Sequence, residues 1–440
     1  MARRLFGTDG VRGVAGQLLT AELALALGRA ATFESSSDRP QVLIVRDTRE
    51  SGPMLEAALA AGIAAEGGDA LVAGVLPTPA ASVLVRRLGL DLAVVISASH
   101  NPWRDNGIKF FGADGRKLDD ATEARIERSV SGSAPVDAPV STTIGRVRTL
   151  EGSIDDYLRE LARAFPLDLS GRRIVLDCAN GATSGAAPAI FKRLGAELEV
   201  LADGPDGRNI NEACGSTHPE ALAERVVAAG AEVGFGFDGD GDRVVAVDAT
   251  GAIRDGDELI AIAALDLAAR GELGRGIAVT VMSNYGLHQA MEAAGIEVAT
   301  TPVGDRSVSS ELSGRDWTLG GEQSGHLIWT GFAPTGDGIA AALLTLGALG
   351  GRSLADTRPF ERLPQVLENV EVADRDAVED ATAVWKAVER EGAALAGRGR
   401  VLIRPSGTEP LVRVMVEAPA QEEAESVCAR LVEIVRAELG

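Results

Sequence analysis

Cysteine, lysine and long apolar runs are scarce in this sequence. Three of its 440 residues are cysteine, an odd number spaced too widely for a disulfide framework or a zinc site, which fits a reducing compartment. No uninterrupted apolar run is long enough to span a bilayer, and the N-terminus lacks the apolar core of a signal peptide. We therefore expect a cytoplasmic protein.

Positive charge is also limited. Lys and Arg number 43 against 64 Asp and Glu, a formal net charge of -21, which argues against nucleic acid or an anionic membrane as a partner. An anionic substrate would need a local cationic pocket. Arginine carries nearly all the positive charge and is the better bidentate phosphate ligand, because the only lysines are Lys109, Lys117, Lys192 and Lys386.

One pattern of strands and helices occurs three times in a chain that is too long for a single core. Each copy is expected to contain a strand, a helix, a strand, a helix and a strand, in that order. The first copy has these elements at residues 42–45, 51–66, 70–75, 79–88 and 92–96, and the second at 174–176, 186–194, 197–201, 219–229 and 233–237. The third has them at 277–281, 286–294, 296–300, 305–313 and 317–319. Such alternation implies layered α/β units. Each unit would present a polar loop after its last strand, and the three loops could face one cleft.

The pattern changes after about residue 368 to a smaller α+β unit. Strands are expected there at 370–372, 401–404 and 411–416, helices at 376–396 and 420–438, and linkers before it near 131–145 and 350–364.

The stretch from Ile96 to Pro102 leaves a buried strand and turns abruptly polar. A hydroxyl, an imidazole and an amide follow the strand. Catalytic groups of α/β proteins tend to lie at the carboxyl ends of strands, so Ser99 is a candidate nucleophile or phosphate carrier. A polar turn is the alternative, and this stretch alone does not decide between them.

Asp238, Asp240 and Asp242 alternate with glycines at the end of another strand. Three carboxylates so close repel one another unless a cation neutralises them, and the glycines let the backbone fold tightly enough for them to converge. Such ligands suit Mg²⁺ or Ca²⁺. An EF-hand is excluded, because Arg243 stands where that loop needs Gly and Ala249 where it needs Glu. Mg²⁺, which leaves room for a phosphate oxygen, is favoured over a solvated acidic turn.

Two nucleotide-binding patterns are excluded. The segment 234–239 matches the spelling GxGxxG, but its glycines lie partly inside a strand, and a second strand at 244–247 follows where a helix should begin. The sequence contains no GxxxxGK[ST] loop.

Two more loops suit a phosphorylated sugar. The first is a good candidate for a phosphate cradle, because it offers a guanidinium, two hydroxyls and the N–H groups of a glycine-bearing turn. Its residues are Arg404, Ser406, Gly407 and Thr408, and Arg413 could add a second guanidinium. A hairpin turn without such a role is the alternative. Glu322 and Ser324 could accept hydrogen bonds from sugar hydroxyls.

A hydroxyl nucleophile near a divalent-metal site suggests phosphoryl transfer. A second phosphate cradle suggests a substrate with phosphate at one end and a reacting hydroxyl at the other. One rival is a phosphatase with an aspartyl nucleophile, although Asp242 stands where that chemistry expects Thr or Val. A non-catalytic sugar-phosphate sensor is a rival of another class.

Taken in order, these motifs resemble the α-D-phosphohexomutase superfamily over essentially the whole chain. They are the segments Gly7–Gly13, Ser97–Pro102, Asp105–Phe110, Asp238–Arg243, Gly321–His326 and Arg404–Pro410. The resemblance implies three similar α/β layered units with mixed sheets and a smaller C-terminal α+β domain around a central active-site cleft. The expected boundaries are 1–150, 151–254, 255–367 and 368–440.

The resemblance also implies roles for the loops. Ser99 would carry a phosphoryl group and, with the three aspartates, hold one Mg²⁺ per active site. Glu322 and Ser324 would contact the sugar, and the cradle from Arg404 to Thr408 would hold the distal phosphate. Residues that match family positions around the reacting phosphate and hydroxyl are Arg12, His100, Lys109, Arg243 and His326.

The implied reaction interconverts glucosamine 6-phosphate and glucosamine 1-phosphate through a 1,6-bisphosphate, on the way to UDP-N-acetylglucosamine and the cell wall. Glucosamine is favoured because Gln323 and the segment 304–306 resemble the amino-sugar members, and a phosphomannomutase or phosphoglucomutase is the alternative. A hexose 1,6-bisphosphate would be the activator. A homodimer would match similar proteins, and the C-terminal domain is expected to act as a lid.

Overall fold

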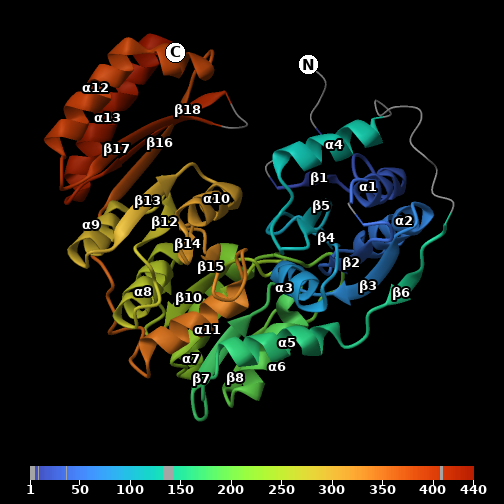
Figure 1. Cartoon of the computed structure of the whole chain (residues 1–440). Coiled ribbons are helices and arrows are strands. Elements are labelled where there is room, and N and C mark those ends of the chain that lie inside the picture. The colour runs from blue at the N-terminus through green and yellow to red at the C-terminus, as the bar shows by residue number, and fades with distance from the viewer. Residues whose placement is uncertain (1–4, 8, 36, 132–142, 407–409) are drawn as a thin grey trace. The chain divides into compact units, whose positions relative to one another are not determined.

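A computed structural model describes residues 5–7, 9–35, 37–131, 143–406 and 410–440 (Figure 1). These residues form two compact units, the first made of residues 1–282 and 296–358 and the second of residues 283–295 and 359–440. The linker predicted near 131–145 lies mostly outside the described residues. None of the described helices combines the length and the apolar character that crossing a bilayer requires.

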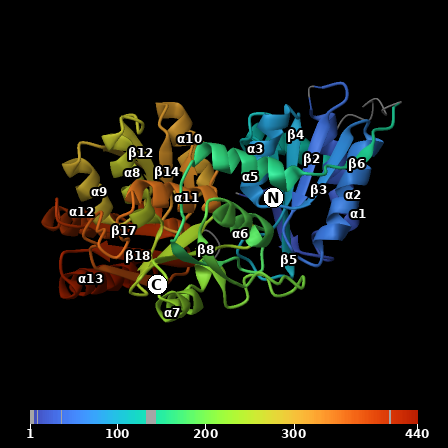
Figure 2. The same cartoon turned by 90° about the horizontal axis from the view of Figure 1, so that it is seen from below.

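The first sheet has six strands in the order β1-β5-β4-β2-β3-β6. Its elements are β1 (Val11–Val14), α1 (Ala21–Phe33), β2 (Gln41–Arg46), α2 (Gly52–Ala65), β3 (Asp69–Val75), α3 (Thr78–Leu88), β4 (Leu92–Ile96), β5 (Asp105–Gly112), α4 (Asp120–Val130) and β6 (Val147–Thr149). Right-handed crossovers put α2 and α3 on opposite faces, and Figure 2 shows them on the two sides of the sheet.

The second sheet has five strands in the order β11-β10-β9-β7-β8, and the third has four in the order β13-β12-β14-β15. The repeat unit built on the second sheet comprises α5 (Ser153–Ala164), β7 (Arg173–Asp177), α6 (Thr183–Arg193), β8 (Glu197–Leu201), the 3₁₀ turn Gly215–Thr217, α7 (Glu220–Ala229), β9 (Val233–Phe237), β10 (Val244–Asp248) and β11 (Ile253–Arg254). The repeat unit built on the third sheet comprises α8 (Gly256–Ala269), β12 (Gly276–Thr280), α9 (Tyr285–Ala293), β13 (Glu297–Thr301), α10 (Asp305–Arg315), β14 (Leu319–Gly321), β15 (Leu327–Trp329) and α11 (Gly338–Leu349).

The predicted threefold repeat is confirmed by the order of the strands. Each sheet contains three parallel strands and one antiparallel strand in equivalent order, β3-β2-β4-β5, β8-β7-β9-β10 and β13-β12-β14-β15. The third strand in chain order, β4, β9 or β14, is buried along its whole length. The polar loop of each unit therefore follows a buried central strand and ends in an antiparallel return.

The C-terminal sheet has the order β16-β18-β17, as expected for a smaller α+β unit. It comprises β16 (Gln365–Glu371), the 3₁₀ turn Asp376–Asp380, α12 (Thr382–Ala394), β17 (Arg400–Pro405), β18 (Leu411–Glu417) and α13 (Gln421–Leu439). The helix expected from residue 376 therefore begins later, and the strand expected at 370–372 begins at Gln365. Helix α9 belongs to the same compact unit, because the buried Glu417 accepts hydrogen bonds from Asn284 (3.2 Å) and from the Tyr285 N–H (3.0 Å).

The buried carboxyl group of Asp337 caps the N-terminus of α11, and its raised pKa makes the stability of the fold depend on pH. Asp337 Oδ1 accepts the Ala340 N–H (2.9 Å) and Oδ2 accepts the Tyr157 hydroxyl (2.7 Å), and burial raises the pKa of Asp337 to about 6. The pKa of an Asp in an unfolded chain is about 3.9, so the folded protein binds one more proton between about pH 3.9 and pH 6 and loses stability as the pH rises through this range.

Asp337→Asn removes this proton and its linkage to folding. We expect the difference in the free energy of unfolding, variant minus wild type, to increase by on the order of 2 kcal/mol from pH 4 to pH 7. Thermal unfolding of both proteins at the two pH values measures the change. A difference between them that is the same at both pH values would contradict it.

Candidate active site

Ser99 lies at the carboxyl end of β4 and is buried, with 1% of its surface exposed. Its φ of 53° is in the left-handed region that residues other than glycine and asparagine rarely adopt. The hydroxyl Oγ donates to Asp238 Oδ2 (2.6 Å) and lies 3.4 Å from His100 Nδ1. A strained, buried serine held against a carboxylate is typical of a functional position rather than of a surface turn.

The three aspartates of the loop after β9 converge as predicted. Asp238, Asp240 and Asp242 are all buried, and they offer ligand atoms within 4.8 Å of one another. Gly239 allows this loop to reach the serine, because a Cβ there would lie 2.7 Å from the Ser99 carbonyl oxygen. The first two predicted loops are thus in direct contact.

The aspartates fit a divalent cation. The oxygens Asp240 Oδ1 and Asp242 Oδ1 are buried without a hydrogen-bond partner in the protein, although Asp242 Oδ1 lies 3.8 Å from Arg243 Nε. Burial, together with the charges of Asp242 and Asp240, raises the pKa of Asp238 well above its usual range. Buried carboxylate oxygens that repel one another and lack donors are the ligand set that a hard cation satisfies.

Cationic side chains surround the aspartates. Lys109, on β5, donates to Asp240 Oδ2 (3.0 Å) and lies 3.1 Å from Asp9. Burial alone would lower the pKa of Lys109, but the neighbouring Asp240, Asp9 and Asp242 raise it, so the side chain is an ammonium. Asp240 Oδ2 also accepts the hydroxyl of Thr78 (2.7 Å).

The two histidines of the site differ in their surroundings. Burial, Arg243 and Arg12 lower the pKa of His100, which is therefore neutral near pH 7. His326 Nε2 accepts the Gly336 N–H (3.2 Å), which leaves the Nδ1 proton facing Asp242 Oδ2 at 3.6 Å.

The third predicted loop lies against the aspartate loop. Arg243 forms an isolated β-bridge with His326, and Val244 N–H donates to the Gly325 carbonyl (3.1 Å). Glu322 is 9% exposed and accepts the Gly304 N–H (3.1 Å), whereas Ser324 is exposed.

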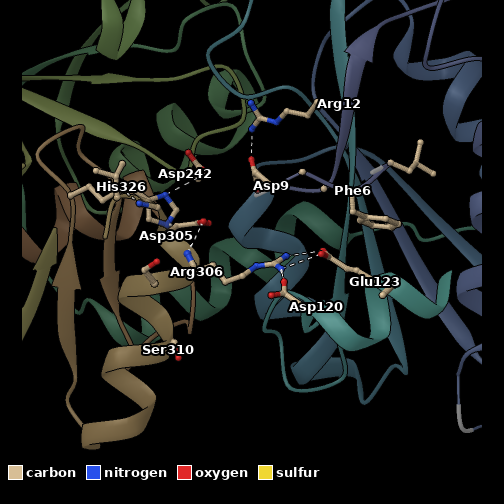
Figure 3. Close-up of a pocket in the computed structure, with 18 of the residues that line it drawn as sticks. Phe6, Asp9, Arg12, Asp120, Glu123, Asp242, Asp305, Arg306, Ser310 and His326 are labelled. Atoms are coloured by element: carbon tan, nitrogen blue, oxygen red, sulfur yellow. Dashed lines mark hydrogen bonds and ion pairs between the residues drawn. The ribbon is translucent and has the colours of Figure 1, made fainter. Parts of the chain in front are cut away.

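A cleft of about 1150 Å³ within the first compact unit is lined by the end of the aspartate loop, at Asp242 and Arg243, and by Glu322 and His326 of the third loop (Figure 3). Arg12 pairs with Asp9 on one side of the cleft, and Arg306 donates to Glu123 Oε1 (2.7 Å) across it. Its wall is formed by Leu5, Phe6, Gly7, Asp9, Gly10, Arg12, Leu18, Asp120, Glu123, Ala124, Glu127, Asp242, Arg243, Val303, Gly304, Asp305, Arg306, Ser307, Ser310, Glu322 and His326.

Three ionisable residues of this site are absent from the sequence prediction. Asp9 accepts from Arg12 and Lys117, and Lys117 also donates to Asp305, so one partly buried network connects loops of the first and third repeats. Two signals in the sequence could have found them. Asp9 lies inside the glycine-rich segment before Arg12, and Lys117 is one of four lysines in the chain.

The predicted phosphate cradle is part of the second compact unit. Arg404 and Arg413 stand opposite each other on the neighbouring strands β17 and β18, so they share one face of the sheet. Burial and the nearby Arg413 lower the pKa of Arg404, because both disfavour the charged guanidinium. Ser406 is buried, and Gly407 and Thr408 lie outside the described residues.

Comparison with known proteins gives the same picture. Sequence profiles of phosphoglucomutase/phosphomannomutase match α/β/α domain I at residues 3–135, domain II at 155–251, domain III at 255–363 and the C-terminal domain at 367–434. A phosphoglucomutase/phosphomannomutase family protein from Burkholderia thailandensis superimposes with a TM-score of 0.85 at 26% identity, over 99% of this chain and 97% of that chain.

Curated relatives match over nearly their full length. The phosphoglucosamine mutase of Moorella thermoacetica is 53% identical over an alignment of 437 positions that covers 97% of this chain and 98% of that protein. The phosphoglucosamine mutase of Mycolicibacterium gilvum is 50% identical over an alignment of 443 positions, gaps included, that covers 99% of each chain. Fold, loops and relatives together define an isomerase that moves a phosphoryl group within a sugar phosphate. The chain belongs to the phosphoglucomutase/phosphomannomutase family.

Proposed function

We propose that the protein interconverts glucosamine 6-phosphate and glucosamine 1-phosphate through a phosphoserine at Ser99. The observation that carries this proposal is the Ser99 hydroxyl, held 2.6 Å from Asp238 within a group of three buried aspartates. Relatives of about 50% identity that are named phosphoglucosamine mutase support the choice of substrate.

In the proposed reaction phospho-Ser99 is first a donor, and the free Ser99 is then an acceptor. The sugar hydroxyl O1 attacks phosphorus, the bond from phosphorus to Ser99 Oγ breaks, the proton of O1 passes to a base, and Ser99 Oγ takes up a proton. After the 1,6-bisphosphate turns around, Ser99 Oγ loses its proton to a base and attacks the phosphorus on O6, the bond from phosphorus to O6 breaks, and O6 takes up a proton. His100 Nδ1, 3.4 Å from Ser99 Oγ, is within reach of a proton at this atom.

Asp238, Asp240, Asp242 and an oxygen on Ser99 would hold one Mg²⁺, which when bound neutralises charge on the phosphoryl group. The chain itself supplies further positive charge. Lys109 is a buried ammonium beside Asp240, and Arg12, Arg243 and the His326 N–H line the same cleft. Positioning and charge neutralisation are the main requirements of phosphoryl transfer.

The remaining predicted residues would bind the two ends of the substrate. Glu322 and Ser324 would accept hydrogen bonds from the sugar hydroxyls. The paired guanidiniums of Arg404 and Arg413 support a distal phosphate cradle that also includes Ser406, Gly407 and Thr408. Because the sugar must bind in two orientations, this cradle would recognise phosphate rather than one sugar carbon.

Several broader expectations remain proposals. The profile matches support domain boundaries near 1–150, 151–254, 255–367 and 368–440. A hexose 1,6-bisphosphate would prime Ser99. A cytoplasmic location and a homodimer stay predictions from the sequence and from similar proteins.

A substrate panel tests the proposed function. Conversion of the 6-phosphates of glucosamine, glucose and mannose to 1-phosphates is measured with Mg²⁺ and a hexose 1,6-bisphosphate. We expect kcat/KM to be at least about 10-fold higher for glucosamine, because about 1.4 kcal/mol of differential binding gives a factor of ten. A preference for mannose or glucose would move the assignment to the alternative mutase, and binding without turnover would favour the sensor.

A further inference from the structure

Arg49 is a completely buried cation that none of the proposed steps uses. It follows β2, the strand beside β4, and its side chain is 0% exposed. Nε donates to Asp47 Oδ2 (2.8 Å), and the Asp47 side chain is equally buried. A buried ion pair is retained only where it forms additional hydrogen bonds.

The other side-chain donors of Arg49 all go to backbone carbonyls between Ser99 and Asp105, the first residue of β5. Nη2 donates to the carbonyl oxygens of Ser99 (2.9 Å) and Asn101 (2.8 Å), and Nη1 to those of Asp105 (2.9 Å) and Pro102. One planar guanidinium thus binds four carbonyls within seven residues. An ammonium has three donors on one atom and cannot reproduce this pattern.

The partners of Arg49 fix the other end of the Ser99 backbone. The Ser99 N–H donates to Ser97 Oγ (2.9 Å), and the Ser97 hydroxyl donates to Asp47 Oδ2 (2.6 Å). The Ser99 carbonyl also accepts from Asn211 Nδ2 (2.9 Å), a residue of the second repeat. Both peptide groups beside Ser99 are therefore tied to the Asp47–Arg49 pair.

We infer that Arg49, together with Asp47, is a positioning residue for phosphoryl transfer. The pair holds Ser99 at its left-handed φ of 53°, from which Oγ meets the aspartate group. Without it the loop would relax toward an ordinary backbone conformation, and Oγ would leave the in-line position that transfer requires. This inference rests on the proposed function, since it assumes that Ser99 carries the phosphoryl group.

Arg49→Lys tests the role, because it keeps the buried charge and removes the planar donors. We expect kcat to fall about 100-fold, the loss that a displacement of about 1 Å causes, with KM changed less than about threefold. The single-turnover rate of Ser99 phosphorylation by glucose 1,6-bisphosphate should fall by the same factor as kcat.

Arg400→Lys is the matched control. Arg400 Nε donates to the fully buried Glu417 (2.7 Å), and its guanidinium also donates to the Ser283 carbonyl. All three residues belong to the second compact unit, whereas Arg49 and Ser99 belong to the first. This variant should lower the midpoint of thermal unfolding and leave the single-turnover phosphorylation rate of Ser99 within about twofold of wild type.

The outcomes separate the two proposals. If Arg49→Lys is folded and phosphorylates Ser99 within twofold of the wild-type rate, the positioning role is wrong. If Arg49→Lys does not fold, Ser97→Ala replaces it, and a phosphorylation rate reduced at least fivefold with unchanged KM is expected, whereas an unchanged rate overturns the inference. If the wild type exchanges no phosphoryl group at Ser99, the proposed function itself fails, whatever the variants do.

Discussion

Ser99→Ala is expected to abolish mutase turnover, with kcat at least about 10⁴-fold below the wild type, because removing a covalent nucleophile eliminates the only group that carries the intermediate. The variant loses the hydrogen bond from Oγ to Asp238, the 3.4 Å contact of Oγ with His100 Nδ1, and no buried volume beyond a hydroxyl. Its fold should therefore survive. Turnover is measured with glucosamine 6-phosphate and a hexose 1,6-bisphosphate labelled in phosphate, followed by detection of acid-stable label on the protein.

Ser82→Ala is the matched control for this prediction. Ser82 is a fully buried serine of the same repeat, on α3, and its hydroxyl donates to the Gly115 carbonyl (2.6 Å). This variant should lose about 1 kcal/mol of stability and keep kcat within about twofold. If Ser99→Ala keeps its turnover and an acid-labile label appears on an aspartate, the phosphoserine proposal is wrong and the covalent intermediate is an acyl phosphate.

The fold was largely predictable because its repeat unit has strong local signals. Short apolar runs such as 92–96 and 233–237 end abruptly in polar loops, and those runs are the central strands of their sheets. Helices α8 and α11 were not predicted, since both are buried on most sides and have no amphipathic period. A 3₁₀ turn at Asp376–Asp380 precedes α12, and the hydrophobic pattern did not distinguish this turn from the start of the helix.

The candidate site was only partly predictable, because its chemistry depends on contacts between repeats. Asp238 and Ser99 were each identified from their own loop, but their hydrogen bond joins positions 139 residues apart. Arg49 offered no signal of this kind. Its position in a polar loop is ordinary, and only the folded chain shows four carbonyls converging on one guanidinium.

The three buried aspartates, two oxygens of which accept no hydrogen bond from the protein, should bind Mg²⁺ in the folded state and not in the unfolded chain. Treatment with a chelator should reduce turnover at least about 10³-fold, a loss of about 4 kcal/mol of transition-state stabilisation, and added Mg²⁺ should restore it. Mg²⁺ at about 100 times its Kd should also stabilise the fold by about 2.7 kcal/mol, measured as a rise in the midpoint of thermal unfolding.

Two aspartate variants decide whether this response comes from the proposed site. Asp240→Asn should lose most of the Mg²⁺-dependent rise, because it removes one anionic ligand. Asp177→Asn should keep the rise, because Asp177 is equally buried but accepts the N–H groups of Ala179 (2.9 Å) and Gly215 (2.8 Å) and lies outside the aspartate group. Equal loss in both variants would mean that buried carboxylates in general, and not this group, cause the dependence. An unchanged response in Asp240→Asn would place the ion elsewhere in the protein, and phosphoryl transfer at Ser99 would then depend on Lys109 and the arginines of the cleft alone.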